Sequence, residues 1–251
     1  MGQLMVGASR RNITPPVGAW MAGFGNRDHG AERIHDELHA RVTVLDDGNT
    51  QAAIVCRDLC FSGEDEMDLL AHMVWLETDL EREQLFVADS HTHSGPNTDR
   101  RADSKNRVWV ENLAGVITGA IVEAQSAMRP AQLRLAQRPV QCGINRREKT
   151  ADGTTVLGRN PDGPCDTVVD IACLQDAETG DPLVTLFRHA AHAVVMGSDN
   201  YAISADYPGA AAAFVERNTP GVAAFLCGCC GNINADPREG FENVAMLGRR
   251  L

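Results

Sequence analysis

The sequence has 251 residues, which is enough to bury the core of one large α/β domain or of two small ones. Its formal net charge of −11 argues against nucleic acid as a main partner, because phosphate binding requires concentrated lysine and arginine. No apolar segment reaches the roughly 18 residues of a membrane helix, and the N-terminus lacks a secretory leader pattern. We therefore expect a cytoplasmic protein without membrane insertion.

The first third of the chain predicts strands that pair through a tight turn. Apolar alternation indicates a strand over residues 4–14 and two strands over residues 39–59. The second pair turns at Asp47-Gly48, a dipeptide typical of β-hairpins. Residues 84–93 then predict a strand of the buried type.

Two helices are expected around that buried strand. Residues 62–82 carry apolar side chains at helical spacing, and Ser62 with Asp65 fits a capping box at the helix start. Residues 105–128 form the second amphipathic helix. The apolar positions of the two helices are Met67, Leu70 and Val74, and then Trp109, Leu113, Val116, Ile117, Ala120 and Ala124.

The second half predicts further alternation of strands and helices. Residues 143–166 are polar and rich in Gly, Asn and Asp, which indicates a long functional loop. The other expected elements are a strand over 131–140, a strand pair over 167–196 turned at Thr179-Gly180, a helix over 204–218 with Ser204 at its cap, a strand over 221–228 and a helix from 241. The fold class is therefore α/β, with mixed β-sheets flanked by helices. Because the sequence stops inside the last expected helix, we expect one domain over 1–251 that is incomplete at its C-terminus.

The stretch "FVADSHTHSGP" places His91 and His93 at the end of the buried strand. If the strand continues through them, both imidazoles point to the same face. Such a pair is typical of metal ligands, or of one ligand and one acid/base group, at the carboxyl edge of an α/β sheet. Two structural histidines are the alternative.

Two further segments carry candidate chemistry. "FRHAAHAVVM" brings His189 and His192 close to Asp206 along the chain, and the alternative is a pair of core histidines. "CGINRR" places Asn145 and Arg146 where the chain leaves a strand, so that the guanidinium can hold an oxyanion or is simply solvated.

Eight cysteines are interpreted as small buried thiols in a reducing compartment, with a disulfide or a cluster ligand as the alternative. Cys230 follows an expected strand and offers a nucleophile, although no neighbouring residue marks a base for it.

Six motifs together resemble the amino-terminal catalytic domain of the neutral/alkaline non-lysosomal ceramidase family. They occur in the order found in that family and span nearly the whole chain: "GASRRNITPP", "IHDELHARVTVLDDG", "DSHTHSGP", "GINRR", "FRHAAHAVVMGSDNYAISADYPG" and "GCCGNIN". The resemblance implies a zinc-dependent amidohydrolase in which metal-bound water attacks an amide or ester carbonyl.

The resemblance also implies roles for single residues. His91 and His192 match the histidine ligands of a Zn²⁺ ion, and His192 matches better than His189. His93 matches a catalytic histidine at the scissile bond, as a proton donor or oxyanion partner, and Arg146 matches an arginine near the substrate amide. The family completes its zinc shell with a Glu and a Tyr from a later part of the chain.

Departures from the family limit what is expected of this chain. Asn234 occupies the position of a serine in a family hexapeptide, so a serine mechanism has no candidate there. With 5% aromatic residues and no leader, we expect a small or soluble N-acyl substrate rather than ceramide. The alternatives are a metal-binding, non-catalytic relative and a cysteine hydrolase that uses Cys230. Asp58 or Asp206 would complete the metal site if the chain is whole. The sequence leaves open whether the protein forms a homo-oligomer.

Overall fold

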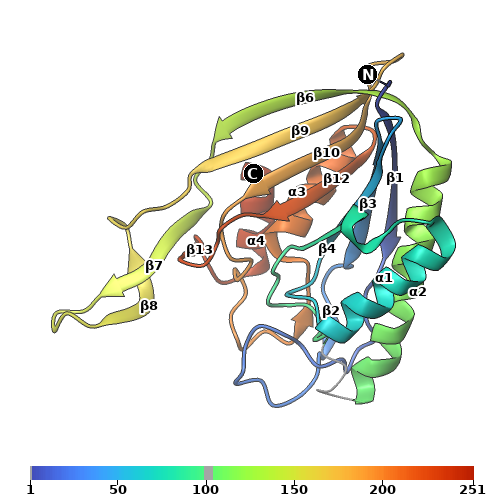
Figure 1. Cartoon of the computed structure of the whole chain (residues 1–251). Coiled ribbons are helices and arrows are strands. Elements are labelled where there is room, and N and C mark those ends of the chain that lie inside the picture. The colour runs from blue at the N-terminus through green and yellow to red at the C-terminus, as the bar shows by residue number, and fades with distance from the viewer. Residues whose placement is uncertain (1, 99–103) are drawn as a thin grey trace.

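The centre of the fold is one large mixed β-sheet (Figure 1), and the computed structural model describes residues 2–98 and 104–251. The strands lie in the order β12-β10-β9-β6-β1-β3-β4-β5. Their bounds are β1 Met5–Asn12, β3 His39–Asp46, β4 Gln51–Arg57, β5 Leu85–Asp89, β6 Arg129–Pro139, β9 Val168–Asp176, β10 Pro182–His189 and β12 Val222–Cys227. The pairs β4–β5 and β10–β12 are parallel and the other pairs are antiparallel. The expected α/β class with mixed sheets is confirmed.

The helices pack in two pairs at different parts of the sheet (Figure 1). Their bounds are α1 Glu64–Thr78, α2 Ser104–Ser126, α3 Asp206–Asn218 and α4 Phe241–Arg250, with a short 3-10 helix η1 at Arg82–Gln84. Helix α2 packs on β1 and β3, and α1 packs against α2. Helix α3 packs on β12, and α4 packs against α3. None of the helices in the described ranges is long and apolar enough to cross a bilayer.

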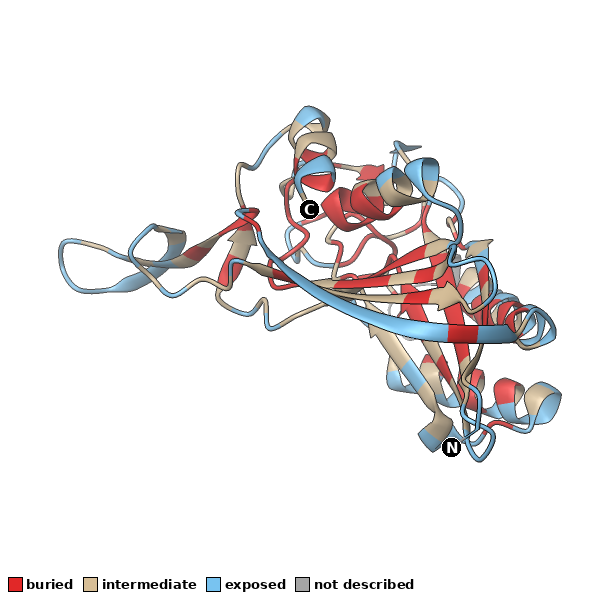
Figure 2. Cartoon of the chain, turned by 90° about the horizontal axis from the view of Figure 1, so that it is seen from above, coloured by how far each residue is buried: buried red, intermediate tan, exposed pale blue. Residues whose placement is uncertain are grey.

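The sheet curls so that its two ends face each other. Strand β12 contacts β3, β4 and β5, although it lies at the opposite edge in strand order. On β1, Val6 faces an apolar cluster inside the curl, whereas Ser9 faces α2 and donates its hydroxyl to Ala120 O at 2.7 Å. Figure 2 shows the buried stretches of these strands gathered between the helix pairs. The curl brings the carboxyl ends of β4 and β5 close to those of β10 and β12.

A hairpin stands where a loop was expected. Residues 143–166 contain β7 Gly143–Lys149 and β8 Thr155–Asn160, and β13 Ile233–Ala235 pairs with β7 on its other side. The prediction of a long loop was wrong because the hairpin projects from the body (Figures 1 and 2) and its strands, mainly polar and largely exposed, lack the apolar alternation of a strand packed on a core. Its tip closes through a hydrogen bond from Thr150 N to Thr154 O at 2.9 Å, next to Gly153 at φ 85°. A further short pair joins β2 Arg33–Ile34 to β11 Ala202–Ile203.

The predicted helix caps were wrong, although both helices exist. Gly63 is the N-cap of α1, and the Ser62 hydroxyl instead donates to Asp89 Oδ2 at 2.7 Å. Ala205 is the N-cap of α3, and the Ser204 hydroxyl donates to Asp36 Oδ2 at 2.6 Å. The Ser62 hydroxyl is engaged by a side chain distant in sequence, whereas Ser204 Oγ also accepts from Asp206 N at 3.0 Å and so still bonds the first residue of α3.

Candidate functional site

Four loops meet where the two parallel strand pairs end. Each loop begins directly after a strand: β4, β5, β10 or β12. Within three residues of these strand ends the loops carry, respectively, Cys60, His91, His192 and Cys230. Within each parallel pair the two loops leave the same edge of the sheet. The curl of the sheet brings the two pairs together, so four positions spread over 171 residues of sequence become neighbours.

Backbone hydrogen bonds hold these loops side by side. His93 N donates to Ala193 O at 3.1 Å, next to a parallel bridge between Thr92 and Ala193. His192 forms a second parallel bridge with Asn234 of β13. The strand β5 ends at Asp89, so the prediction that it continues through His91 and His93 was wrong. His91 has φ 62°, a left-handed conformation that turns its ring toward the loop after β10.

The imidazoles of His91 and His192 lie edge to face, with ring centroids 4.8 Å apart and planes inclined by 63°. The Nδ1 of each ring lies 2.7 Å from a backbone carbonyl, Cys60 O for His91 and Cys230 O for His192. A carbonyl oxygen can only accept a hydrogen bond, so the proton of each neutral ring is on Nδ1. The Nε2 atom of each ring then has a lone pair that can bind a metal ion. Metal-bound histidines are anchored by such contacts at the outer ring nitrogen.

His93 completes a triangle of rings with these two. Its Nε2 lies 3.4 Å from His91 Nε2, and its ring centroid lies 5.7 Å from that of His192. Burial, reinforced by the neighbouring imidazoles of His91 and His192, lowers the pKa of His93 to about 3. His93 is therefore neutral at pH 7, and its buried Nδ1 has no hydrogen-bond partner among the described residues.

A buried arginine near His93 was not predicted from the sequence. Arg27 is 8% exposed, donates to Ala22 O at 2.7 Å and to Asn200 O at 3.1 Å, and holds its guanidinium 5.0 Å from the Phe24 ring centroid. Its positive charge contributes to the lowered pKa of His93. The signal that could have found it is the glycine-rich stretch "AGFGNR", in which small residues allow a close approach to the histidine.

Arg146 lies on β7, within a strand rather than where the chain leaves one. Its Nε donates to Gly231 O at 3.1 Å, and its Nη1 donates to Asn234 Oδ1 at 3.4 Å. Asn234, the residue at the position of the family serine, thus orients the guanidinium. The Arg146 charge also contributes to the lowered pKa of His93, so the two catalytic candidates are close in space.

All eight cysteines are free thiols, and they are not uniformly buried. Cys229 is exposed, whereas Cys60 is buried, and burial raises its thiol pKa to about 12. A hydrogen bond from the Cys227 thiol lowers the pKa of Cys230. The spacing of these two is C-x-x-C, a signal in the sequence that the interpretation as inert thiols missed.

Two groups of potential metal donors exist in the described part of the chain. One contains Cys60, His91 and His93, and the other contains His91, His192 and Cys230, with the donor atoms of each group within 4.8 Å of one another. Neither group contains a carboxylate. The donor set is therefore one of imidazole and thiol, which suits zinc better than calcium or magnesium.

Three other candidates lie outside both groups. His189 turns its Nδ1 to Val168 O at 3.0 Å. Asp58 accepts from Arg41 Nη1 and from His39 N, both at 2.9 Å. Asp206 accepts from backbone N–H groups, including that of Val195 at 3.1 Å. The expectation that Asp58 or Asp206 fills a vacancy in the metal site was wrong, because both carboxylates are already engaged.

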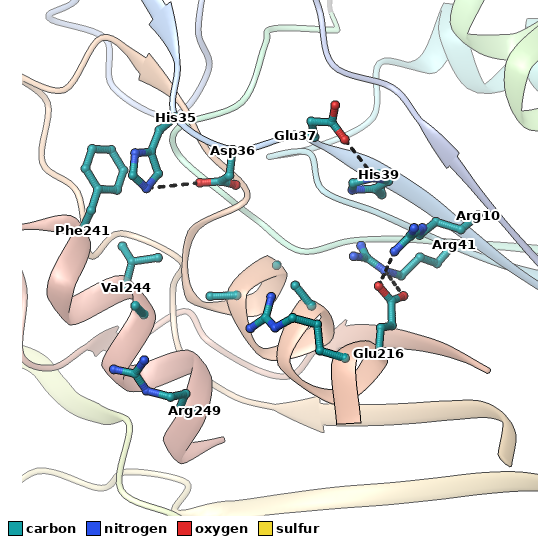
Figure 3. A pocket seen from close by; sticks show the side chains of 15 residues that line it. Arg10, His35, Asp36, Glu37, His39, Arg41, Glu216, Phe241, Val244 and Arg249 are labelled. Atoms are coloured by element: carbon teal, nitrogen blue, oxygen red, sulfur yellow. Dashed lines mark hydrogen bonds and ion pairs between the residues drawn. The ribbon is translucent and has the colours of Figure 1, made fainter. Parts of the chain in front are cut away.

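A recess of about 400 Å³ lies elsewhere, between β1 and β3 on one side and α3 and α4 on the other (Figure 3). Glu216 sits in it between Arg10 and Arg41, at 2.6 and 3.1 Å, and His35 stacks on Phe241 with centroids 3.5 Å apart. None of the clustered histidines lines this recess. Its charged groups pair mainly with each other, so we place the candidate chemistry at the strand ends instead.

A family comparison identifies this arrangement. The sequence profile described as "Neutral/alkaline non-lysosomal ceramidase, N-terminal" matches residues 4–228. The chain belongs to this ceramidase family. The matched span contains His91, His93, Arg146 and His192, and it ends two residues before Cys230.

Two solved ceramidases share the fold. The neutral ceramidase from Pseudomonas aeruginosa superposes with a TM-score of 0.82 at 21% identity, over 100% of this chain and 44% of that chain. A structure described as ceramidase complexed with C2 gives a TM-score of 0.82 at 19% identity, over 100% of this chain and 43% of that one. The chain thus spans less than half the length of these ceramidases.

Proposed function

We propose that the protein is a zinc-dependent hydrolase of an amide or ester bond, with the zinc ion held by His91 and His192. One observation carries the proposal: two imidazoles, with ring centroids 4.8 Å apart and with one donor nitrogen each in a common group, are both anchored at Nδ1 by a backbone carbonyl. Membership of the ceramidase family supports hydrolysis of an amide.

The residues of the cluster fit a zinc ion. Neutral imidazole is a preferred zinc ligand, and fixing of the outer nitrogen raises the basicity of the inner one. When bound, zinc supplies Lewis acidity that polarises a carbonyl group and activates water.

His93 and Arg146 would act on the substrate itself. A neutral imidazole whose pKa is about 3 is a poor base, but it donates a hydrogen bond to a carbonyl oxygen without giving up its proton. Arg146, fixed by Gly231 O and Asn234 Oδ1, brings a positive charge to the same region. Together they would stabilise the negative charge that develops on the carbonyl oxygen.

The substrate we propose is a small or soluble N-acyl compound. A net charge of −11 disfavours docking on an anionic membrane surface, where a long-chain lipid amide would reside. The low aromatic content, 5%, also leaves few of the side chains that anchor proteins at lipid interfaces.

Zinc content and turnover, measured on purified variants, test the proposal. We expect His91→Ala and His192→Ala to lose bound zinc, as measured by mass spectrometry of the metal. His189→Ala is the matched control from the same segment, and His72→Ala, on the exposed side of α1, is a second control; both should keep zinc.

Hydrolysis of short N-acyl substrates separates the enzyme from its alternative. We expect His93→Ala to keep zinc and to lose turnover by about 10²- to 10³-fold, the range for loss of one hydrogen-bond donor to a developing oxyanion. Wild-type protein that binds zinc without any turnover would instead be a metal-binding, non-catalytic relative. Full zinc occupancy in His91→Ala and His192→Ala would overturn the ligand assignment.

A further inference from the structure

Three arginines of the described residues are buried, and only one of them lacks a carboxylate partner there. Arg41 and Arg57 each form ion pairs with two carboxylates, at 2.7–3.1 Å. The hydrogen bonds of Arg27 go to two backbone carbonyls instead. Burying a guanidinium without a counter-charge is unfavourable. The fold thus keeps one buried cation without neutralisation, and this cation lies beside the histidine cluster.

The Arg27 guanidinium is held at a fixed place next to His93. Its Nη1 donates to Ala22 O at 2.7 Å, and its Nη2 donates to Asn200 O at 3.1 Å. Both acceptor residues are bonded to the segment that follows His93. Ala22 N donates to Gly95 O at 2.9 Å, and the Asn200 amide donates to the serine hydroxyl just before that glycine at 3.0 Å. The cation and the imidazole therefore belong to one hydrogen-bonded unit.

Three of the five N–H groups of Arg27 have no partner within residues 2–98 and 104–251. Nε is buried and unpaired, and Nη1 and Nη2 spend one N–H each on their carbonyls. The guanidinium also lies 5.0 Å from the centroid of the Phe24 ring, and that ring lies edge to face with the His93 imidazole, with centroids 5.0 Å apart. An aromatic ring compensates a buried cation only in part. A carboxylate would accept two N–H groups in parallel, the geometry that a guanidinium matches best.

A second arginine at the site also bonds only neutral oxygens. Arg146 donates to Gly231 O and to Asn234 Oδ1 and forms no ion pair with a described residue. Besides burial and the neighbouring imidazoles, both guanidinium groups lower the pKa of His93, so both charges act at the cluster. The site is thus locally positive in a chain whose net charge is −11, which favours a negatively charged ligand at this place.

We propose that Arg27 binds a carboxylate of the substrate, which is then an amide with a negative charge a few bonds from the scissile carbonyl. This inference rests on the proposed function, because it assumes that His93 contacts the carbonyl that is attacked. Arg27 is then a specificity-determining residue, whereas His93 and Arg146 act on the carbonyl oxygen. N-acyl amino acids carry such a carboxylate on the amine side, and monoamides of dicarboxylic acids carry it on the acyl side.

Binding of an analogue that cannot be hydrolysed tests the proposal apart from turnover. In 4-oxopentanoate a methylene group replaces the amide nitrogen of N-acetylglycine, and 4-oxopentanamide is its uncharged counterpart. We expect the wild-type protein to bind the carboxylate about 10- to 100-fold more tightly than the amide, the range for hydrogen bonds to a charged group. Dissociation constants from NMR titration measure this ratio, and the wild-type value is read without any variant.

Variants then assign the preference to one side chain. Arg27→Met should abolish it, and Arg27→Lys, which keeps the charge but not the paired N–H groups, should keep only part of it. Arg33→Met removes an exposed arginine of the same segment and is the matched control, with the wild-type ratio expected. Turnover of N-acetylglycine and of N-methylsuccinamate by zinc-loaded protein shows on which side of the amide the carboxylate lies, and Arg27→Met should raise the KM of the better substrate by about 10- to 100-fold.

The outcomes separate this inference from the proposed function. Equal wild-type affinity for 4-oxopentanoate and 4-oxopentanamide would overturn the role of Arg27 and leave zinc binding by His91 and His192 intact. A preference that survives in Arg27→Met would also overturn it, because the metal ion or another side chain would then hold the carboxylate. Wild-type protein that takes up no zinc would overturn the proposed function and, with it, the interpretation of the bound carboxylate as part of a substrate.

Discussion

The missing side chain of Gly23 shapes the surroundings of His93. Gly23 has φ 93°, and a β-carbon at this position would lie 2.6 Å from His93 Nδ1. This distance is shorter than van der Waals contact allows, so the glycine permits the loop of residues 19–25 to close over the imidazole. The neighbouring hydrogen bond from Ala22 N to Gly95 O, at 2.9 Å, fixes that loop to the histidine segment.

Gly23→Ala should therefore displace His93 while the metal ligands stay in place. We expect a loss of turnover of up to about 100-fold, typical of a misplacement of about 1 Å, and a decrease in the unfolding free energy of about 1–3 kcal/mol from strain at positive φ. Gly25→Ala is the matched control, because a β-carbon there meets open space. Unchanged turnover in Gly23→Ala would show that the exact position of His93 is unimportant, and zinc content should be equal in both variants.

One buried arginine, Arg57, connects three elements beneath the site through ion pairs. Arg57, at the end of β4, donates from Nη1 to Glu66 of α1 at 2.7 Å and from Nε to Asp89 at the end of β5 at 2.9 Å. Burial alone would lower the pKa of Arg57, but Asp89 and Glu66 raise it above its ordinary value. Arg57 O also accepts from Ser90 N at 2.8 Å, next to His91. The ion cluster thus sets where the His91 loop begins.

Glu66→Ala leaves the fully buried guanidinium of Arg57 with one carboxylate partner fewer. We expect a loss of unfolding free energy of about 3–5 kcal/mol, the usual effect of breaking a buried ion pair from one side. Glu64→Ala, in the same helical turn but exposed, should cost less than about 1 kcal/mol. Urea unfolding of both variants measures the difference, and equal losses would show that the Arg57 cluster adds no more than a surface charge.

Elements with a strong apolar period could be predicted from the sequence, and elements defined by tertiary contacts could not. The turns at Asp47-Gly48 and Thr179-Gly180 were predicted, with Gly48 and Gly180 at φ 88° and 78°, and so were the four α-helices of residues 2–98 and 104–251. The β7–β8 hairpin was missed because its faces are mainly polar. The Arg57 cluster was missed because its partners come from three elements.

At the scale of the whole molecule, the curl of the sheet determines the site. His91 follows β5 at one edge and His192 follows β10 near the other edge, and only the packing of β12 against β4 and β5 brings them together. The hydrophobic periodicity of single strands gives no information on whether the sheet curls in this way. The resemblance to the family indicated His91, His93, Arg146 and His192. Arg27 and the pairing of Cys227 with Cys230 were recognised only in the folded chain, although a glycine-rich stretch and the C-x-x-C spacing mark them in the sequence.

Asp206 links this closure to the pH dependence of stability. The carboxylate is 1% exposed at the start of α3 and accepts from Val195 N at 3.1 Å and Met196 N at 3.4 Å, so it joins α3 to the loop that follows His192. Complete burial raises the pKa of Asp206 to about 7, against the opposing effect of these hydrogen bonds. Between pH 4 and pH 7, roughly, the folded protein holds a proton here that the unfolded chain has released.

The contribution of Asp206 to the unfolding free energy is therefore complete below about pH 4 and is lost as the pH rises to about 7, by a few kcal/mol at most. Asp206→Asn cannot ionise and should remove this part of the pH dependence. Below about pH 4, where both side chains are neutral, it should cost about 1–3 kcal/mol, because an amide N–H₂ would face one of the backbone donors. This cost should shrink as the pH rises to about 7, since only the wild-type protein then loses stability. Urea unfolding of both proteins at about pH 5 and about pH 8 measures the effect. Parallel stability profiles for the two proteins would mean that Asp206 is ionised over the whole range, held by its backbone donors in spite of its burial.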